Sequence, residues 1–202
     1  MSNPNVTPAE AASAVWSTRA NKSVSADKGL VSHESELRSE PTMSQPRARA
    51  LVAADLWIGI DDTDNLESRG TGFHARELLR FLQQEGCGVP LAVTRHQLLV
   101  DERIPYTSHN SSACVAWHHE PATAIEDVID LAAAWLERES APGSDPGLAV
   151  LAQPAAEVLS ETTLASLIRF GQEAKTRVLE RGDAHGLAAE LGVHLSGHGG
   201  TN

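Results

Sequence analysis

Three carboxylates stand within four residues of one another, in the sequence Asp61-Asp62-Thr63-Asp64. Carboxylates this close repel one another unless a positive group joins them, and Mg²⁺ carrying phosphate oxygens is the usual partner. The spacing is therefore that of a metal site made by Asp61, Asp62 and Asp64. A solvated turn that ends a strand accounts for the same residues, and the sequence alone leaves both interpretations open.

A pair of glycines follows, in the sequence Gly70-Thr71-Gly72, just before a segment of helical apolar spacing. The free backbone amides and the dipole at a helix N-terminus favour an anion. Thr71 is suited to cap the helix or to offer its hydroxyl to a phosphate. A flexible turn with an N-cap is the alternative interpretation. The GxxxxGK[ST] pattern of a Walker A loop is absent.

Two further polar residues are candidates for ligand binding. Arg95 falls in an expected strand and Asn110 in a loop rich in hydroxyl side chains, so together they could orient a phosphate or a base edge. Ordinary turn hydrogen bonds explain the loop equally well. Neither Cys87 nor Cys114 has the neighbours expected of a nucleophile, and an apolar strand should bury Cys114.

Apolar periodicity predicts the elements that must position these residues. Strands are expected over 56–60, 91–100, 111–118 and 147–152. Helices are expected over 73–85, from 121 to about 136, over 162–181 and over 184–191. The order β-α-β-β-α-β followed by helices predicts an α+β, ferredoxin-like fold of the split βαβ type, with additional C-terminal helices.

Composition divides the chain in two. Residues 1–54 are rich in Ser, Ala, Asn, Glu and Pro without a sustained apolar period, so we expect a disordered tail. They carry six basic and five acidic groups, whereas residues 55–202 carry ten and 22, a net charge of −12. Such an acidic domain is a poor candidate for duplex-DNA binding, which depends on neutralising phosphates. No apolar run approaches the roughly 20 residues that span a bilayer. Two cysteines fit a reducing cytoplasm.

The string Ile58-Gly59-Ile60-Asp61-Asp62-Thr63-Asp64, followed by Gly70-Thr71-Gly72, resembles the start of the catalytic, kinase-like domain of archaeal tRNA agmatinylcytidine synthetase. That family modifies the wobble cytidine of an isoleucine tRNA, using ATP and agmatine. Thr94-Arg95, Ile104-Pro105, Thr107 and Asn110 are similar to its second block, and Gly199-Gly200-Thr201 is similar to the start of a third, glycine-rich block.

The resemblance implies roles for the matching positions. Asp61, Asp62 and Asp64 would bind Mg²⁺ and the phosphates of ATP, and Thr71 would handle a phosphate. The cofactor-binding residues would be Gly70, Gly72, Arg95, Asn110, Gly199 and Gly200. Because the glycine-rich block should continue past Asn202, the resemblance also implies that the domain over 55–202 is incomplete at its C-terminus.

The chain departs from this family in length and in residues. It lacks the length and the cysteines for the synthetase's OB fold and zinc ribbon, and Ser108 and His109 replace an arginine and a glycine of the second block. The leading hypothesis is a cytoplasmic Mg²⁺/ATP-dependent ligase or phosphotransferase. It would phosphorylate an acceptor oxygen, of a tRNA or another molecule, for attack by an amine. The alternatives are a non-catalytic ferredoxin-like module that binds a nucleotide or small ligand, and a fragment that needs a partner chain.

Overall fold

The computed structural model describes residues 54–104, 110–153 and 159–197. Its five-stranded antiparallel sheet has the order β2-β3-β1-β4-β5. The elements in chain order are β1 (Leu56–Asp61), α3 (Thr71–Gln84), β2 (Gly88–Gln97), β3 (Ser111–His119), α4 (Ile125–Glu139), β4 (Gly147–Ala152), α5 (Glu161–Glu173), α6 (Arg181–Leu191) and β5 (His194–Gly197). Their order and pairing confirm the α+β, ferredoxin-like prediction. The tail predicted over 1–54 lies, apart from residue 54, outside the described residues.

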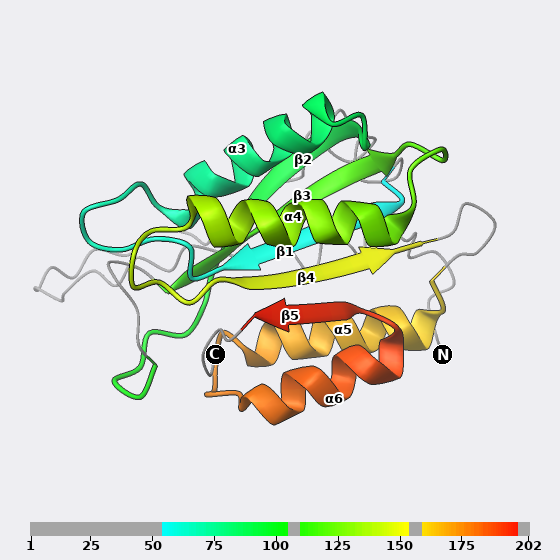
Figure 1. Cartoon of the computed structure of the whole chain (residues 1–202). Coiled ribbons are helices and arrows are strands. Elements are labelled where there is room, and N and C mark those ends of the chain that lie inside the picture. Colours follow the sequence, from blue (N-terminus) through cyan, green and yellow to red (C-terminus); the bar gives the residue numbers. More distant parts are fainter. Residues whose placement is uncertain (1–53, 105–109, 154–158, 198–202) are drawn as a thin grey trace, which may run out of the picture.

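One face of the sheet is covered by α3 and α4 (Figure 1). Alternation along β1 turns Leu56, Ile58 and Ile60 towards these helices, and each of them is at most 1% exposed. The helices pack apolar side chains at helical spacing against this face of the sheet, such as Leu78 on α3 and Val128 on α4, both fully buried. This core fixes the end of β1 against the beginning of α3, where the candidate site lies.

Strand β3 lies between β2 and β1 in the sheet and carries buried side chains on both of its faces. Trp117 belongs to the core under the helices and is 0% exposed, and its indole nitrogen donates to the carbonyl of Cys87. Cys114 is buried as predicted, but it lies on the face of the sheet opposite the helices, in register with Gly59. Burial raises the pKa of the Cys114 thiol to about 12, which leaves it un-ionised and unreactive.

The C-terminal segment corrects the prediction of one long helix over 162–181. Helix α5 ends at Glu173 and α6 begins at Arg181, so two helices with a connection between them occupy this stretch. Helix α6 contacts β5, the edge strand of the sheet, and Figure 1 shows α5 and α6 beyond this edge. Strand β5, which no pattern predicted, pairs with β4. None of the described helices has the length and apolarity needed to cross a bilayer.

Candidate functional site

The acidic loop, residues 61–64, begins with a sharp turn at the end of β1. Asp61 is the last residue of the strand and pairs in register with Gly147 of β4. Its Oδ1 accepts the backbone N–H of Asp62 at 2.8 Å. Asp62 has φ 46°, in the left-handed region that Asp tolerates better than most residues. The chain therefore leaves the sheet abruptly, directly before Thr63 and Asp64.

The three predicted metal ligands do not converge on one point. Alternation along β1 places Asp61 on the side of Trp57 and Gly59, away from α3 and α4. Within the ranges that the structure describes, no three His, Cys, Asp or Glu side chains are arranged to hold a metal ion. The geometry thus separates Asp61, which shapes the turn, from Asp62 and Asp64, which follow it.

Asp62 has a neighbour that the sequence patterns did not single out, Asp145, in the turn before β4. The Oδ2 atom of Asp62 accepts the backbone N–H of Asp145 at 3.3 Å. Burial raises the pKa of the Asp62 carboxyl; the N–H of Asp145 lowers it in part, and the negative charges of Asp145 and Asp64 raise it further. This crowding of negative charge is what a divalent cation would relieve.

Asp64 lies against the N-terminus of α3. Gly70 is the N-cap of this helix, and no side chain caps its first turn. The hydroxyl of Thr71 donates to Asp64 Oδ1 at 3.4 Å, and a Cβ added to Gly70 would lie 3.4 Å from Asp64 Oδ2. The structure therefore brings Asp64, Gly70 and Thr71 together, although Thr71 is only 5% exposed. Their roles in phosphate binding remain predictions.

Arginine side chains also lie near the start of this helix. Arg95 of β2 lies on the face of the sheet that α3 covers, and its Nε and Nη2 both donate to Ser111 Oγ, at 3.1 and 2.9 Å. A Cβ at Gly72 would lie 3.9 Å from Arg95 Cδ and 4.0 Å from Arg76 Nη1. Gly72 is thus flanked by two guanidinium side chains, of which the sequence analysis named only Arg95.

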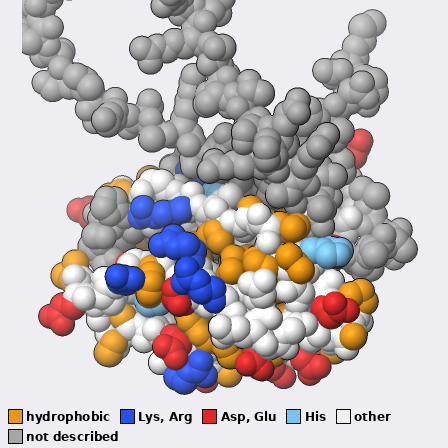
Figure 2. Space-filling model, turned by 90° about the horizontal axis from the view of Figure 1, so that it is seen from above, with side chains coloured by type: hydrophobic (Ala, Val, Ile, Leu, Met, Phe, Trp, Pro, Cys, Tyr) orange, Lys and Arg blue, Asp and Glu red, His pale blue; other side chains and the backbone are white. Residues whose placement is uncertain are grey.

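A third arginine extends this positive surface. The guanidinium carbon of Arg69 lies 4.4 Å from the centroid of the Phe73 ring. Figure 2, which looks down on the α3 side of the domain, shows Lys and Arg side chains gathered beside a hydrophobic area. No described acidic side chain pairs with Arg69, Arg76 or Arg95. These three residues, hereafter the arginine group, can therefore meet an anion without first breaking an ion pair.

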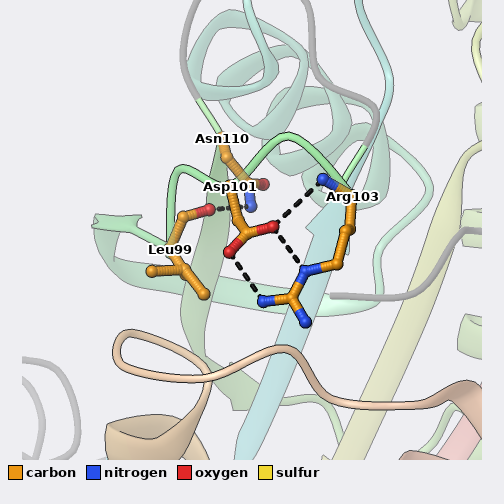
Figure 3. A network of polar contacts seen from close by, with 4 residues as sticks. All are labelled: Leu99, Asp101, Arg103 and Asn110. Atoms are coloured by element: carbon orange, nitrogen blue, oxygen red, sulfur yellow. Dashed lines mark hydrogen bonds and ion pairs between the residues drawn. The ribbon is translucent and has the colours of Figure 1, made fainter.

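Asn110, the other residue predicted beside Arg95, lies at the start of β3 and is 4% exposed. Its side-chain nitrogen donates to the carbonyl of Leu99 at 2.7 Å (Figure 3). Its backbone carbonyl accepts from the amide of Leu98 at 2.9 Å. Nearby, Arg103 forms a two-point contact with Asp101, and this contact lowers the pKa of Asp101 to about 2. Asn110 thus ties the ends of the β2–β3 connection together, and its contact with a nucleotide stays a prediction. Gly199 and Gly200 lie outside the described residues.

No protein-family model and no curated protein matches the chain. Solved structures of similar fold do exist. Apo TiaS, an agmatidine synthetase that acts on an isoleucine tRNA, has a TM-score of 0.55 at 17% identity over 71% of this chain and 31% of its own. The complex of TiaS with that tRNA and ATP gives 0.57 at 17% identity over 72% and 33%. A tRNA fluorescent labeling enzyme gives 0.55 at 18% identity over 71% and 32%. The chain spans about a third of these proteins, and its fold is similar to that part of TiaS, which confirms the resemblance seen in the sequence.

Proposed function

We propose that the domain is a Mg²⁺- and ATP-dependent enzyme that transfers a phosphoryl group, with RNA as the acceptor. The observation that carries this proposal is the arrangement around the N-terminus of α3. Asp64 contacts Gly70 and Thr71 at the start of the helix, Asp62 lies two residues before Asp64, and Arg76 and Arg95 flank Gly72 one residue further along. This pairing of cation-binding and anion-binding groups suits a metal–triphosphate complex better than either ion alone.

The donor set fits magnesium bound together with phosphate. Mg²⁺ in phosphate-transferring proteins is held by one or two carboxylates, with phosphate and water completing its shell. Asp62 and Asp64 supply that number, so a three-carboxylate cage is not required. When bound, the ion would neutralise charge that develops on the transferred phosphoryl group. Asp61 would not bind the ion itself; it would orient Asp62 by accepting the backbone N–H of that residue.

The phosphates would lie over the first turn of α3. The uncapped turn at Gly70 offers backbone N–H groups and the positive end of the helix dipole. Gly72 keeps the surface between Arg76 and Arg95 free of a side chain. Transfer then breaks the bond between the terminal phosphoryl group and its leaving oxygen and forms a bond to the acceptor oxygen. An amine would displace the phosphate in a second step, as the ligase hypothesis requires.

An RNA acceptor is supported by the local charge and by the fold. Exposed arginines gather on the α3 side although the domain is acidic overall (Figure 2). TiaS, whose fold this domain shares in part, has been crystallised with a tRNA and ATP. An enzyme with these substrates would act in the cytoplasm.

A second candidate is a nucleotide-binding module without catalysis. The separation of Asp61 from Asp62 and Asp64 favours it, because a catalytic site that needed all three carboxylates on one metal would not form. Binding of ATP without turnover, in the presence and absence of tRNA, would identify this candidate.

Thermal unfolding with and without Mg·ATP tests the binding step. Ligand at about 100 times its dissociation constant adds roughly 2.7 kcal/mol, a shift of about 5–10 °C for a domain of this size. Asp62→Asn and Asp64→Asn should lose the shift, whereas Asp130→Asn, on the exposed face of α4, should keep it. A wild-type protein with no shift, or Asp62→Asn and Asp64→Asn variants with the full shift, would contradict the proposed site. Release of phosphate from ATP when tRNA is added then separates the enzyme from the binding module.

A further inference from the structure

Thr63 is the uncharged residue of the acidic loop and is completely buried. Its carbonyl accepts the backbone N–H of Ala141, just beyond α4, at 3.0 Å. Its hydroxyl oxygen lies 2.9 Å from Nδ1 of His74, in the first turn of α3. The loop that carries Asp62 and Asp64 is therefore attached at this one residue to both helices that cover the sheet.

His74 is equally enclosed. It is 7% exposed, and its ring meets the ring of Trp135 of α4 edge-on, with centroids 6.4 Å apart. Burial lowers the pKa of His74, against the opposite influence of the Asp64 and Glu139 carboxylates. The imidazole is therefore neutral at physiological pH, and its contact with Thr63 is a hydrogen bond between two uncharged groups.

The remaining connections between the loop and the helix are weak or exposed. Thr71 and Asp64 are joined by a long hydrogen bond of 3.4 Å. In the intervening segment, 65–70, Asn65 and Ser68 form local hydrogen bonds, and Asn65 Nδ2 donates to the carbonyl of Pro142 at 3.1 Å; all of these bonds are exposed. A buried hydrogen bond shielded from water constrains geometry more strongly than such contacts do.

We propose that the Thr63–His74 hydrogen bond is a positioning pair. It fixes the acidic loop against the first turn of α3, so that Asp62, Asp64 and the helix amides meet a metal–nucleotide complex as one preformed site. Neither residue touches the ligand; both act through Asp62 and Asp64, the neighbours of Thr63 in the chain. The inference rests on the proposed function for the identity of the ligand, and on the apo geometry for the constraint itself.

Four substitutions test the pair. Thr63→Val keeps the shape and removes the hydroxyl, whereas Thr63→Ser keeps the hydroxyl. His74→Phe keeps a ring and removes both nitrogens, whereas His74→Asn retains a polar group near the position of Nδ1. Mg·ATP affinity should fall about 10- to 100-fold in Thr63→Val and His74→Phe, as for other residues that orient metal ligands. Thr63→Ser and His74→Asn should recover most of the loss, and the Thr63→Val/His74→Phe double variant should bind no worse than either single variant.

Amide hydrogen exchange of the protein without nucleotide provides an independent measurement. Peptides that cover residues 61–68 should exchange faster in Thr63→Val than in the wild type, while peptides from α4 away from Trp135 stay unchanged. Equal exchange, equal Mg·ATP affinity or independent effects in the double variant would overturn the inference. If the wild type binds no Mg·ATP, the proposed function fails, and the exchange rates alone then decide whether the pair constrains the loop.

Discussion

Acidification should destabilise this domain through His96, a residue of β2 next to Arg95. His96 is 3% exposed, and its Nε2 lies 2.9 Å from the Thr94 hydroxyl. Burial and, to a smaller extent, the positive charge of Lys175 lower the pKa of His96 from 6.5 to about 4. Between these two pH values the unfolded chain takes up a proton that the folded protein does not. The free energy of unfolding therefore falls as the pH falls from about 6.5 to 4.

The two pKa values set the size of this effect. The pKa of His96 is about 2.5 lower in the folded than in the unfolded chain. Below pH 4 this difference lowers the free energy of unfolding by at most roughly 3 kcal/mol, and at pH 5 by about 2 kcal/mol. These figures are upper values, because water reaching a protonated imidazole would reduce the difference. A loss of 1–2 kcal/mol would still be a large fraction of the roughly 5–15 kcal/mol that stabilises a typical domain.

Urea unfolding at about pH 7.5 and pH 5 measures the loss directly. Other groups, His74 among them, contribute to the pH dependence of the wild type, so the informative quantity is the difference from a variant. His96→Gln retains a polar contact for Thr94 and cannot be protonated, and it should lose about 1–2 kcal/mol less than the wild type between the two pH values. His185→Gln, on the exposed side of α6, is the matched control and should behave as the wild type. The reasoning would be refuted by an equal loss in His96→Gln, or by an NMR titration of His96 with a midpoint near 6.5.

Three further outcomes follow from single residues. Arg95→Gln should weaken Mg·ATP binding about 10-fold or more in calorimetry, whereas Arg169→Gln on exposed α5 should not; equal affinities would remove Arg95 from the site. Gly88→Ala should lower the free energy of unfolding by about 3 kcal/mol or more, as measured in urea. Gly88 has a φ of +133°, and a Cβ there would lie 2.2 Å from the His118 carbonyl oxygen. An unchanged urea midpoint would contradict this contact. Ser160→Ala should cost about 1 kcal/mol, because the Ser160 hydroxyl accepts the Thr163 amide at the start of α5, and Ser160→Asp should restore the stability.

The part of the fold that the sequence predicted is the part whose periodicity reflects burial. β1, β3 and β4 lie within a residue of their predicted bounds, because each contains a run of at least five apolar or glycine residues. The prediction of one long C-terminal helix over 162–181 was wrong for a related reason. Leu179 continues the apolar spacing of α5 and is 0% exposed, yet it lies in the connection that precedes α6. Apolar spacing indicates that a side chain is buried. It does not indicate whether the backbone at that residue is helical, so it could not predict the connection between α5 and α6.

Part of the candidate site could be predicted from the sequence for the same physical reason. A carboxylate cluster after a buried strand and glycines before a helix had to meet at one end of the sheet, and Asp64, Gly70 and Thr71 do. The position of Asp61 on the opposite face follows from alternation along β1, a signal that was present in the sequence. Asp145 and Arg76 carried no such signal, because tertiary packing alone brings them near Asp62 and Gly72.

We expect the local charge, rather than the net charge of the domain, to determine which ligand the proposed site binds. A net charge of −12 over residues 55–202 argued against nucleic acid, yet charges separated by more than about 8 Å are largely screened at physiological salt. Arg76 and Arg95 flank Gly72 well within that distance, so a phosphate there meets them before it meets the acidic surface of α4. The carboxylates Asp62 and Asp64 repel a bare phosphate, but they attract one that carries a divalent cation. We therefore expect the proposed site to bind a phosphate that carries a divalent cation more tightly than a free phosphate, which is a form of selectivity that an evenly basic surface could not provide.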